Sequence, residues 1–387
     1  MKIKIYFLLF IFFPFLISAQ TVTKSLNLAT AGNLSTELTA DLKNTVTNLM
    51  LSGNINARDF KCLRDEMIVL KELDMSGASI LAFSGTGGTL ATNSSYAANQ
   101  IPEYAFSFSS TSKGKVSLTK VLLPANLTSI ANYAFWECTG LLDIIIPNGV
   151  TSLGEGSFKG CTNLATATLS NALTKIDNTA FYRCYALKSI VIPGSVTQIG
   201  SSSFYQCTNL AAINIPNSVK SIGNFAFEGC GWATTITIGS GIETIGTEAF
   251  KDCLSVTALS INRPVGPVIN TSTFSGMKKW EVLFEVPVGR AQNYKSAPGW
   301  VEFSNIKEKS VFTSIVLPEQ NSSVSVVSTP EGLLVNGLQK NELITVYTIT
   351  GSQIFQNRTK SSQQLIPLQK GKIYLVKTNS KSFKVSL

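Results

Sequence analysis

Six cysteines are the most regularly spaced residues of this chain that could carry chemistry. Each follows the one before it by 23 residues. Thiols repeated in this way could form a stack of disulfides or a ladder of metal ligands. Metal sites, however, normally show close pairs such as Cys-x₂-Cys, and the sequence contains none. The six residues are Cys138, Cys161, Cys184, Cys207, Cys230 and Cys253.

Phenylalanines keep the same step and stand three residues ahead of the cysteines, at Phe135, Phe158, Phe181, Phe204, Phe227 and Phe250. One turn of α-helix or 3₁₀-helix would point both members of such a pair inward. Parallel inward side chains suit disulfide geometry poorly, and a small, weakly polar thiol is a common core residue. We therefore predict a buried column of unbridged thiols beside a buried phenylalanine column, with Cys62 in the core as well.

Histidine is absent from the chain. Its absence removes the commonest general base, the Ser-His and Cys-His nucleophile pairs, and histidine-ligated metal sites. Paired carboxylates can hydrolyse glycosides without histidine, but solvated surface charge explains the closest acidic pairs, Asp65-Glu66 and Glu72/Asp74, more simply. We predict that the protein is not an enzyme and has no catalytic residue, no cofactor and no metal site, with a hydrolase as the remote alternative.

The net charge of +9 is distributed unevenly along the chain. Residues 21–310 carry 22 basic and 20 acidic side chains, whereas residues 311–387 carry 8 basic and 3 acidic ones. The central part is therefore nearly neutral, and it offers no basic stripe that a phosphate backbone could follow. We predict that the protein does not bind nucleic acid.

The first 19 residues have the pattern of a signal peptide. Lys2 and Lys4 form a charged start, residues 5–17 an apolar run, and Ser18 and Ala19 the small residues before a cleavage site. The apolar run is shorter than the ~20 residues that span a bilayer, so a short membrane anchor is the alternative and export the expectation. No later segment is predicted to be transmembrane.

The repeat itself predicts a solenoid, because a fixed period between about 20 and 50 residues marks units that bury their apolar faces against their neighbours. Apolar residues two apart, such as Ile144 and Ile146, predict one short strand per repeat, and Ser189 to Ile192 is expected to be another such strand. Prolines then end the strands at positions 124, 147, 193 and 216. Stacked in parallel, these strands would form a sheet on one face, with tight turns on the other.

The unit I-G-x-x-A/S-F-x-x-C-x-x-L-x-x-I-x-I-P-x-x-V-x-x resembles the BspA-type leucine-rich repeat of surface and secreted proteins from anaerobic bacteria and some protozoa. The resemblance covers about residues 25–310 and holds its register through six copies. It implies an N-terminal cap with irregular first repeats over residues 20–100. It also implies a leucine-rich-repeat solenoid with a C-terminal cap over residues 101–310.

Residues 311–387 change character and show short β-type runs at 322–327, 333–338, 343–349, 373–377 and 382–387, which predict a small antiparallel sandwich. The frame from Ile344 to Gly351, with Leu368 to Gly371, Ile373 to Lys377 and the closing Phe383 to Val385, resembles the C-terminal sorting domain of type IX secretion in Bacteroidetes. Lys372 departs from the pattern of that family, in which the glycine is followed directly by the aliphatic-Tyr pair. That resemblance implies contact with the outer-membrane secretion machinery. An ordinary immunoglobulin-like terminal domain is the alternative.

The residues between the inward strand positions would line an open sheet face. This face is small, hydroxyl-rich and aliphatic, and it is expected to carry charge only at its N-terminal end, at Lys120 and Asp143. The candidate ligand face is formed by Thr166, Thr168, Ser189, Val191, Ala212, Asn214, Thr235 and Thr237. We predict an exported, surface-attached or secreted protein that binds host or microbial surface proteins. A glycan-binding protein and a purely structural surface protein are the alternatives.

Overall fold

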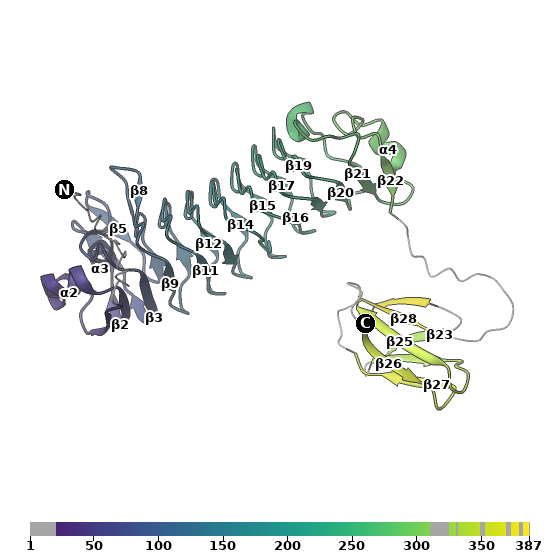
Figure 1. Cartoon of the computed structure of the whole chain (residues 1–387), viewed down its shortest axis with the longest axis horizontal. Helices are drawn as coiled ribbons and strands as arrows, with labels where there is room; N and C mark the ends of the chain where they lie inside the picture. The colour runs from purple at the N-terminus through teal and green to yellow at the C-terminus, as the bar shows by residue number, and fades with distance from the viewer. Residues whose placement is uncertain are drawn as a thin grey trace, which may run out of the picture. The chain divides into compact units, whose positions relative to one another are not determined.

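The computed structural model describes residues 21–309, 325–329, 332–348, 353–368, 373–378 and 382–386. The chain divides into two compact units, Met1–Lys309 and Ser310–Leu387. In the first unit, successive coils of the chain stack into a solenoid with parallel sheets (Figure 1). The predicted signal peptide lies outside the described residues.

One face of the solenoid carries the longer strands, all of which pair in parallel. The first four form a sheet in the order β1 (Thr23–Leu28), β2 (Asn48–Ile55), β3 (Glu72–Ile80) and β9 (Lys120–Leu122). The next coils contribute β11 (Asp143–Ile145) and β13 (Thr166–Thr168). The last sheet runs β16 (Ala212–Ile215), β18 (Thr235–Ile238), β20 (Ala258–Ile261), β21 (Leu283–Val286) and β22 (Ile306–Glu308).

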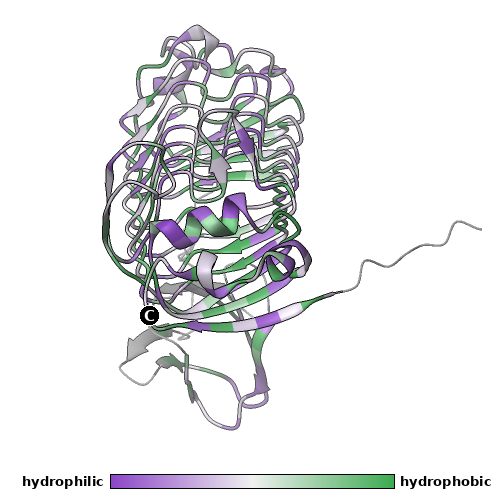
Figure 2. Ribbon diagram, turned by 90° about the vertical axis from the view of Figure 1, so that its left-hand side faces the viewer, coloured by the Kyte–Doolittle hydropathy of each residue, from purple (hydrophilic) through white to green (hydrophobic). Residues whose placement is uncertain are grey.

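The register of these strands follows the repeat. Ala212 pairs with Thr235 and Thr235 with Ala258, each one 23-residue coil further on. Inward residues such as Ile213, Ile236 and Leu259 are buried, while their neighbours in sequence face solvent. Figure 2 looks along the stack and shows hydrophobic and hydrophilic residues alternating along the strands. The alternation places one residue row inside and the next on the open face.

The coil at Ser189 to Ile192 differs from the prediction. It forms only an isolated bridge between Thr166 and Ser189, and it is not a strand. Backbone hydrogen bonds from Lys188 N to Ala165 O (3.2 Å) and from Ala211 N to Lys188 O (3.0 Å) keep the coil in the stack. Strands here are three or four residues long, so the loss of a few ladder bonds is enough to end one.

A second ladder of very short strands runs on another face of the solenoid, where only tight turns were predicted. It forms two sheets. The first consists of β6 (Gln100–Ile101), β10 (Ser129–Ile130) and β12 (Ser152–Leu153). The second consists of β14 (Lys175–Ile176), β15 (Gln198–Ile199), β17 (Ser221–Ile222) and β19 (Thr244–Ile245). Each strand places one buried Ile or Leu inward.

The turns between the two ladders have a regular backbone with two left-handed residues in each coil. Thr179 and Arg183 in one coil correspond to Ser202 and Gln206 in the next, with φ between 53° and 57°. Glycine takes both positions in one coil, at Gly156 and Gly160. Non-glycine residues rarely adopt this conformation. In the turns from Tyr133 to Gly229, three backbone N–H groups per coil donate to the following coil and hold the strained turns in place. Phe181 N to Ser203 O is one such bond, at 2.7 Å.

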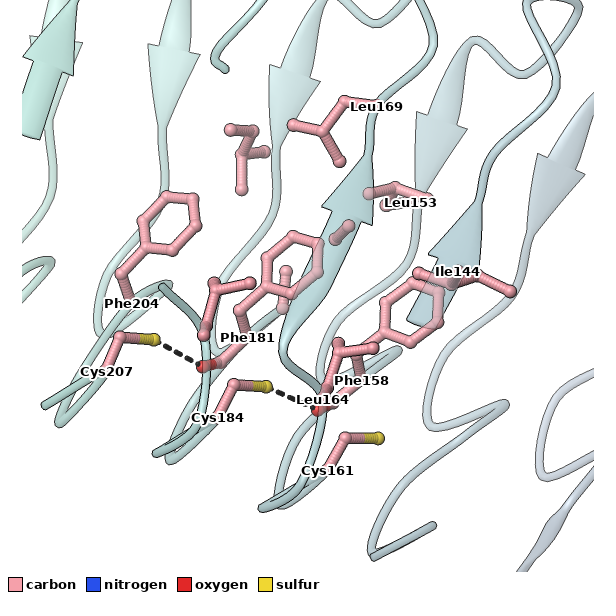
Figure 3. Packing of buried hydrophobic residues seen from close by; sticks show 14 of the residues in the cluster. Ile144, Leu153, Phe158, Cys161, Leu164, Leu169, Phe181, Cys184, Phe204 and Cys207 are labelled. Atoms are coloured by element: carbon pink, nitrogen blue, oxygen red, sulfur yellow. Dashed lines mark hydrogen bonds between the residues drawn. The ribbon is translucent and has the colours of Figure 1, made fainter. Parts of the chain in front are cut away.

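The core of the solenoid contains a stack of phenylalanine rings. Phe135, Phe158, Phe181, Phe204, Phe227 and Phe250 are all fully buried. Their ring centroids lie 5.1 to 5.5 Å apart with interplanar angles of 2° to 9°. Figure 3 shows the rings of Phe158, Phe181 and Phe204 facing one another across successive coils. A stacked aromatic pair contributes about 0.5–1.5 kcal/mol beyond the area that it buries.

Both ends of this stack are closed by aromatic and helical segments. At the N-terminal end, Phe60 from α3 (Ala57–Asp65) meets Phe106 edge-on at 5.8 Å. Helices α1 (Leu34–Glu37) and α2 (Ala40–Thr45) precede it. At the other end, η1 (Thr271–Phe274) and α4 (Ala291–Lys295) accompany Trp300, which contacts Phe274 at 5.4 Å. Caps are expected because an open stack would expose its apolar end.

Two excursions leave the N-terminal coils. The first contains the hairpin of β4 (Phe83–Gly85) and β5 (Ser94–Tyr96), and the second that of β7 (Ser107–Phe108) and β8 (Lys113–Gly114). Arg64 is buried between them and donates to the carbonyl oxygens of Thr89 (2.8 Å) and Ser107 (3.1 Å). The guanidinium therefore ties both excursions to α3.

The second unit is all-β in its described residues. One antiparallel sheet has the order β23 (Ser325–Thr329), β24 (Gly332–Asn336) and β27 (Gln363–Ile366). The other has the order β26 (Gln353–Arg358), β25 (Leu343–Thr348), β28 (Ile373–Lys377) and β29 (Ser382–Ser386). The two sheets share a small core that includes Leu333, Val335, Ile344, Val346 and Val376. Gly351 and Gly371 of the sorting-domain frame, and Lys372, which interrupts it, lie outside the described residues.

None of the helices in the described residues has the length and apolar character that crossing a bilayer requires.

Candidate functional site

The open face of the parallel sheet places the predicted ligand residues in two rows. Thr166, Ser189, Ala212 and Thr235 belong to one row, and Thr168, Val191, Asn214 and Thr237 to the other. All eight are at least partly exposed, and Val191 is 81% exposed. The sequence therefore identified which side chains face solvent, although the coil at Val191 is not a strand.

Charge on this face is not confined to its N-terminal end. Glu285 on β21 pairs in register with Lys307 on β22, in the row that continues from Ser260. The expectation of charge only at Lys120 and Asp143 is therefore wrong. Comparison of the repeats with one another did not identify Glu285 and Lys307, because the cap region lacks the cysteine motif that sets the register.

The N-terminal part of the same face contains residues that the repeat did not reveal. Across β1, β2, β3 and β9, one row consists of Ser25, Met50, Asp74 and Leu122. The row beside it consists of Thr23, Asn48, Glu72 and Lys120. These strands lie side by side at the N-terminal end of the stack (Figure 1). Their coils vary in length, so no fixed period marks them in the sequence.

Two shallow depressions lie on this part of the face. One, of about 220 Å³, is lined by Asn48, Met50, Glu72, Lys120 and Leu122 among others. The second, of about 400 Å³, is lined by residues that include Ser25, Ser52, Ser76 and Gly77. Met50 and Asp74 line both. The central coils thus present small side chains, whereas the surface of the N-terminal strands is uneven.

The aromatic residues of the turn face stack on neighbouring coils. Tyr182 and Tyr205 lie 4.7 Å apart in parallel planes, and Lys159 Nζ lies 5.5 Å from the Trp136 ring and 5.3 Å from that of Tyr182. Trp136, Tyr182 and Tyr205 are half-buried as a result. These side chains stabilise contacts between coils, so they are weaker candidates for a ligand surface than the open face.

The cysteine column lies behind the phenylalanines and has hydrogen-bond partners. Each Sγ donates to a phenylalanine carbonyl oxygen of the preceding coil at 3.1 to 3.4 Å. Figure 3 shows two of these bonds, from Cys184 to Phe158 and from Cys207 to Phe181. Burial raises the pKa of Cys207 to about 12. A protonated, enclosed thiol is a poor nucleophile and a poor metal ligand.

One of the two acidic pairs is engaged in contacts of the fold, and the other lies on the open sheet face. Asp65 accepts hydrogen bonds from Arg64, and Glu66 accepts hydrogen bonds from Ser35 and forms an ion pair with Lys43 at 2.6 Å. Glu72 and Asp74 face the open sheet. Among the described residues, no group of three or more His, Cys, Asp or Glu side chains could hold a metal ion.

Comparison with known proteins identifies the repeat. Residues 99–210 and 174–287 match the family described as BspA type leucine rich repeat region, in six copies. The first unit is accordingly a leucine-rich-repeat solenoid, as the sequence predicted. No curated protein sequence matches the chain.

Several solved structures resemble parts of the chain. A leucine-rich-repeat protein of T. pallidum is 29% identical over 35% of this chain and 72% of its own, with a TM-score of 0.32. A leucine-rich cell surface protein of Faecalibacterium prausnitzii is 20% identical over 74% of this chain and 83% of its own, with a TM-score of 0.34. The pneumococcal vaccine antigen PcpA is 16% identical over 69% of this chain and 74% of its own, with a TM-score of 0.39.

Proposed function

We propose that this chain, whose residues 99–287 match BspA-type leucine-rich repeats, is an exported, non-enzymatic binding protein that engages surface proteins of a host or of other microbes. The single observation that supports this most strongly is the open sheet face. It extends over successive coils in three parallel sheets, and its side chains are at least partly exposed. The aromatic side chains of the turn face, by contrast, are used in coil–coil contacts.

Export is proposed on the leader pattern of residues 1–19 and on the resemblance of the last 60 or so residues to a type IX sorting domain. The antiparallel sheets of the second unit are compatible with that resemblance, and equally with an ordinary immunoglobulin-like domain. On the sorting interpretation, the second unit contacts the outer-membrane secretion machinery while the solenoid binds the ligand.

The test is a pull-down with the mature chain against extracellular-matrix, epithelial and bacterial surface proteins. The variant Thr168→Glu/Val191→Glu places two charges on the centre of the open face, where neither side chain supports the core. It is expected to lose partner capture with its melting curve unchanged. The matched control Ser255→Glu/Val268→Glu adds the same charge at exposed positions outside the candidate ligand face. Equal capture by both variants would place the binding site elsewhere.

A further inference from the structure

The N-terminal end of the open face differs chemically from the rest of it. Met50, Leu122 and Ile145 are 50%, 38% and 63% exposed there. Asp74 lies in register between Met50 and Leu122, and Ile145 follows on the next coil. Large aliphatic side chains exposed in this way are typical of interaction surfaces when they form one patch. We call this patch, with Glu72 and Lys120 beside it, the N-terminal patch.

The surface of the N-terminal patch is uneven because neighbouring side chains differ in size. Met50 and Asp74 line both depressions and so lie between them. On one side the floor is made of small residues, Ser25, Ser52 and Gly77. On the other side the wall is formed by Glu72 and Leu122. A partner side chain inserted into either depression would meet Asp74, and one inserted into the smaller depression would meet Glu72 as well.

The charge of the patch is negative although the solenoid is nearly neutral. Glu72 and Asp74 of the patch, with Asp143 on the following coil, amount to three carboxylates against one lysine, Lys120. Glu72 accepts a hydrogen bond from Asn48 Nδ2 at 3.0 Å, and Asp74 accepts one from Ser76 N at 2.8 Å. In the described part of the chain, none of the four charged side chains forms an ion pair, even though Glu72 and Lys120 are register neighbours. The carboxylates are thus available to a cation supplied from outside.

We propose that the N-terminal patch anchors a protein partner through a segment that carries a lysine or arginine next to aliphatic side chains. This inference rests on the proposed function and adds the chemistry of the partner segment that the N-terminal patch binds. The cation complements Glu72 and Asp74, and the aliphatic groups cover Met50, Leu122 and Ile145. Phosphate-bearing partners, such as nucleic acids and anionic lipids, are disfavoured because the carboxylates repel them.

The test uses a phage-displayed library of random dodecapeptides, selected on the immobilised full-length protein. A parallel selection uses the variant Glu72→Gln/Asp74→Asn, which removes both charges and keeps side-chain size. Peptides enriched on the unmodified protein are expected to combine Lys or Arg with Leu, Ile or Val. Synthesised individually, they should bind the variant roughly fivefold more weakly or worse, since two exposed ion pairs are worth about 0.5 kcal/mol each.

Peptides without basic residues, equal binding to the variant, or no enrichment at all would each overturn the proposal. The outcome is separable from that of the proposed function. If the pull-down partner is lost with Thr168→Glu/Val191→Glu but retained with Glu72→Gln/Asp74→Asn, the open face binds and the anchor lies elsewhere. If neither variant affects capture, the open face is not the binding surface.

Discussion

At the scale of single residues, size and hydrogen bonding account for the choice of cysteine in the buried column. The side chain at position 184 is fully enclosed, and its sulfur donates to Phe158 O at 3.2 Å, beside the bond that this oxygen accepts from Cys161 N. A thiol meets both needs with a weak donor that tolerates burial. Burial also raises the pKa of Cys138 to about 12, so the sulfur keeps its proton at neutral pH.

We predict that all seven cysteines remain free thiols in protein made under oxidising conditions. Alkylation after denaturation, read by mass, should label every cysteine, whereas the native protein should react with almost none because the thiols are buried. Three disulfides in the denatured sample would contradict the prediction. Labelling of the native protein would instead show that the column is accessible.

Lys115 is a second buried residue with a measurable consequence. Its Nζ donates to Met67 O at 2.6 Å, and burial lowers its pKa from 10.5 to about 8. The unfolded chain then binds more protons than the folded one between pH 8 and 10.5, so this residue makes stability rise with pH across that window. Keeping Lys115 charged at neutral pH therefore lowers the free energy of unfolding by about 3 kcal/mol relative to alkaline pH.

Comparing Lys115→Met with the unmodified protein isolates this effect from other titrating groups. The free energy of unfolding should be measured by denaturant titration near pH 7 and near pH 10. As the pH rises, the free energy of unfolding of the unmodified protein should increase by about 1–3 kcal/mol relative to that of the variant. A difference between the two proteins that does not change with pH would show that Lys115 is solvated in the folded state.

At the scale of the coil, stability depends on stacked neighbours. Phe181 contacts Phe158 at 5.4 Å and Phe204 at 5.5 Å and is fully buried. Replacing it by alanine should leave a cavity and cost about 3–5 kcal/mol. Because coils support each other, hydrogen exchange should accelerate in the flanking coils too. The matched control is Val191→Ala, an exposed side chain of the same repeat. Equal melting temperatures for the two variants would contradict the stack.

The sequence predicts these coils well because the period repeats the same buried contacts six times. It does not predict the second ladder, since a strand such as Ser129–Ile130 is too short to show alternation. It does not predict the left-handed turns either, because Tyr133, Gly156, Thr179 and Glu248 at equivalent positions share no side-chain chemistry. The residues around Ser189 have a strand-like sequence, so nothing in the local sequence predicts that the ladder bonds are missing there.

The candidate site shows the same division. The rows from Thr166 to Thr237 were predicted because they lie within the regular period. Met50, Glu72 and Asp74 could not be aligned with them, because the coils that hold β2 and β3 lack the cysteine motif. In the second unit, β26 and β27 were missed because their polar sequences, such as Gln353–Arg358, carry little apolar alternation.

At the scale of the whole molecule, the two units have separate cores and should fold separately. Removing residues 311–387 should leave the melting transition of the solenoid in place. In a host with type IX secretion, the truncated protein should accumulate in the periplasm, as judged by fractionation and immunoblotting. Normal arrival of the truncated protein at the cell surface would show that the second unit is not the sorting signal.

The central claim, that the open sheet face binds the partner, is tested most directly by oxidative footprinting of the complex. Ile145 and Val191 report on the open face, while Trp232, 68% exposed, and Val268, 91% exposed, report on other surfaces. The partner captured in the pull-down should protect Ile145 and Val191 from hydroxyl radicals and leave Trp232 and Val268 fully reactive. Protection of Trp232 or Val268 with undiminished oxidation of Ile145 and Val191 would contradict the account.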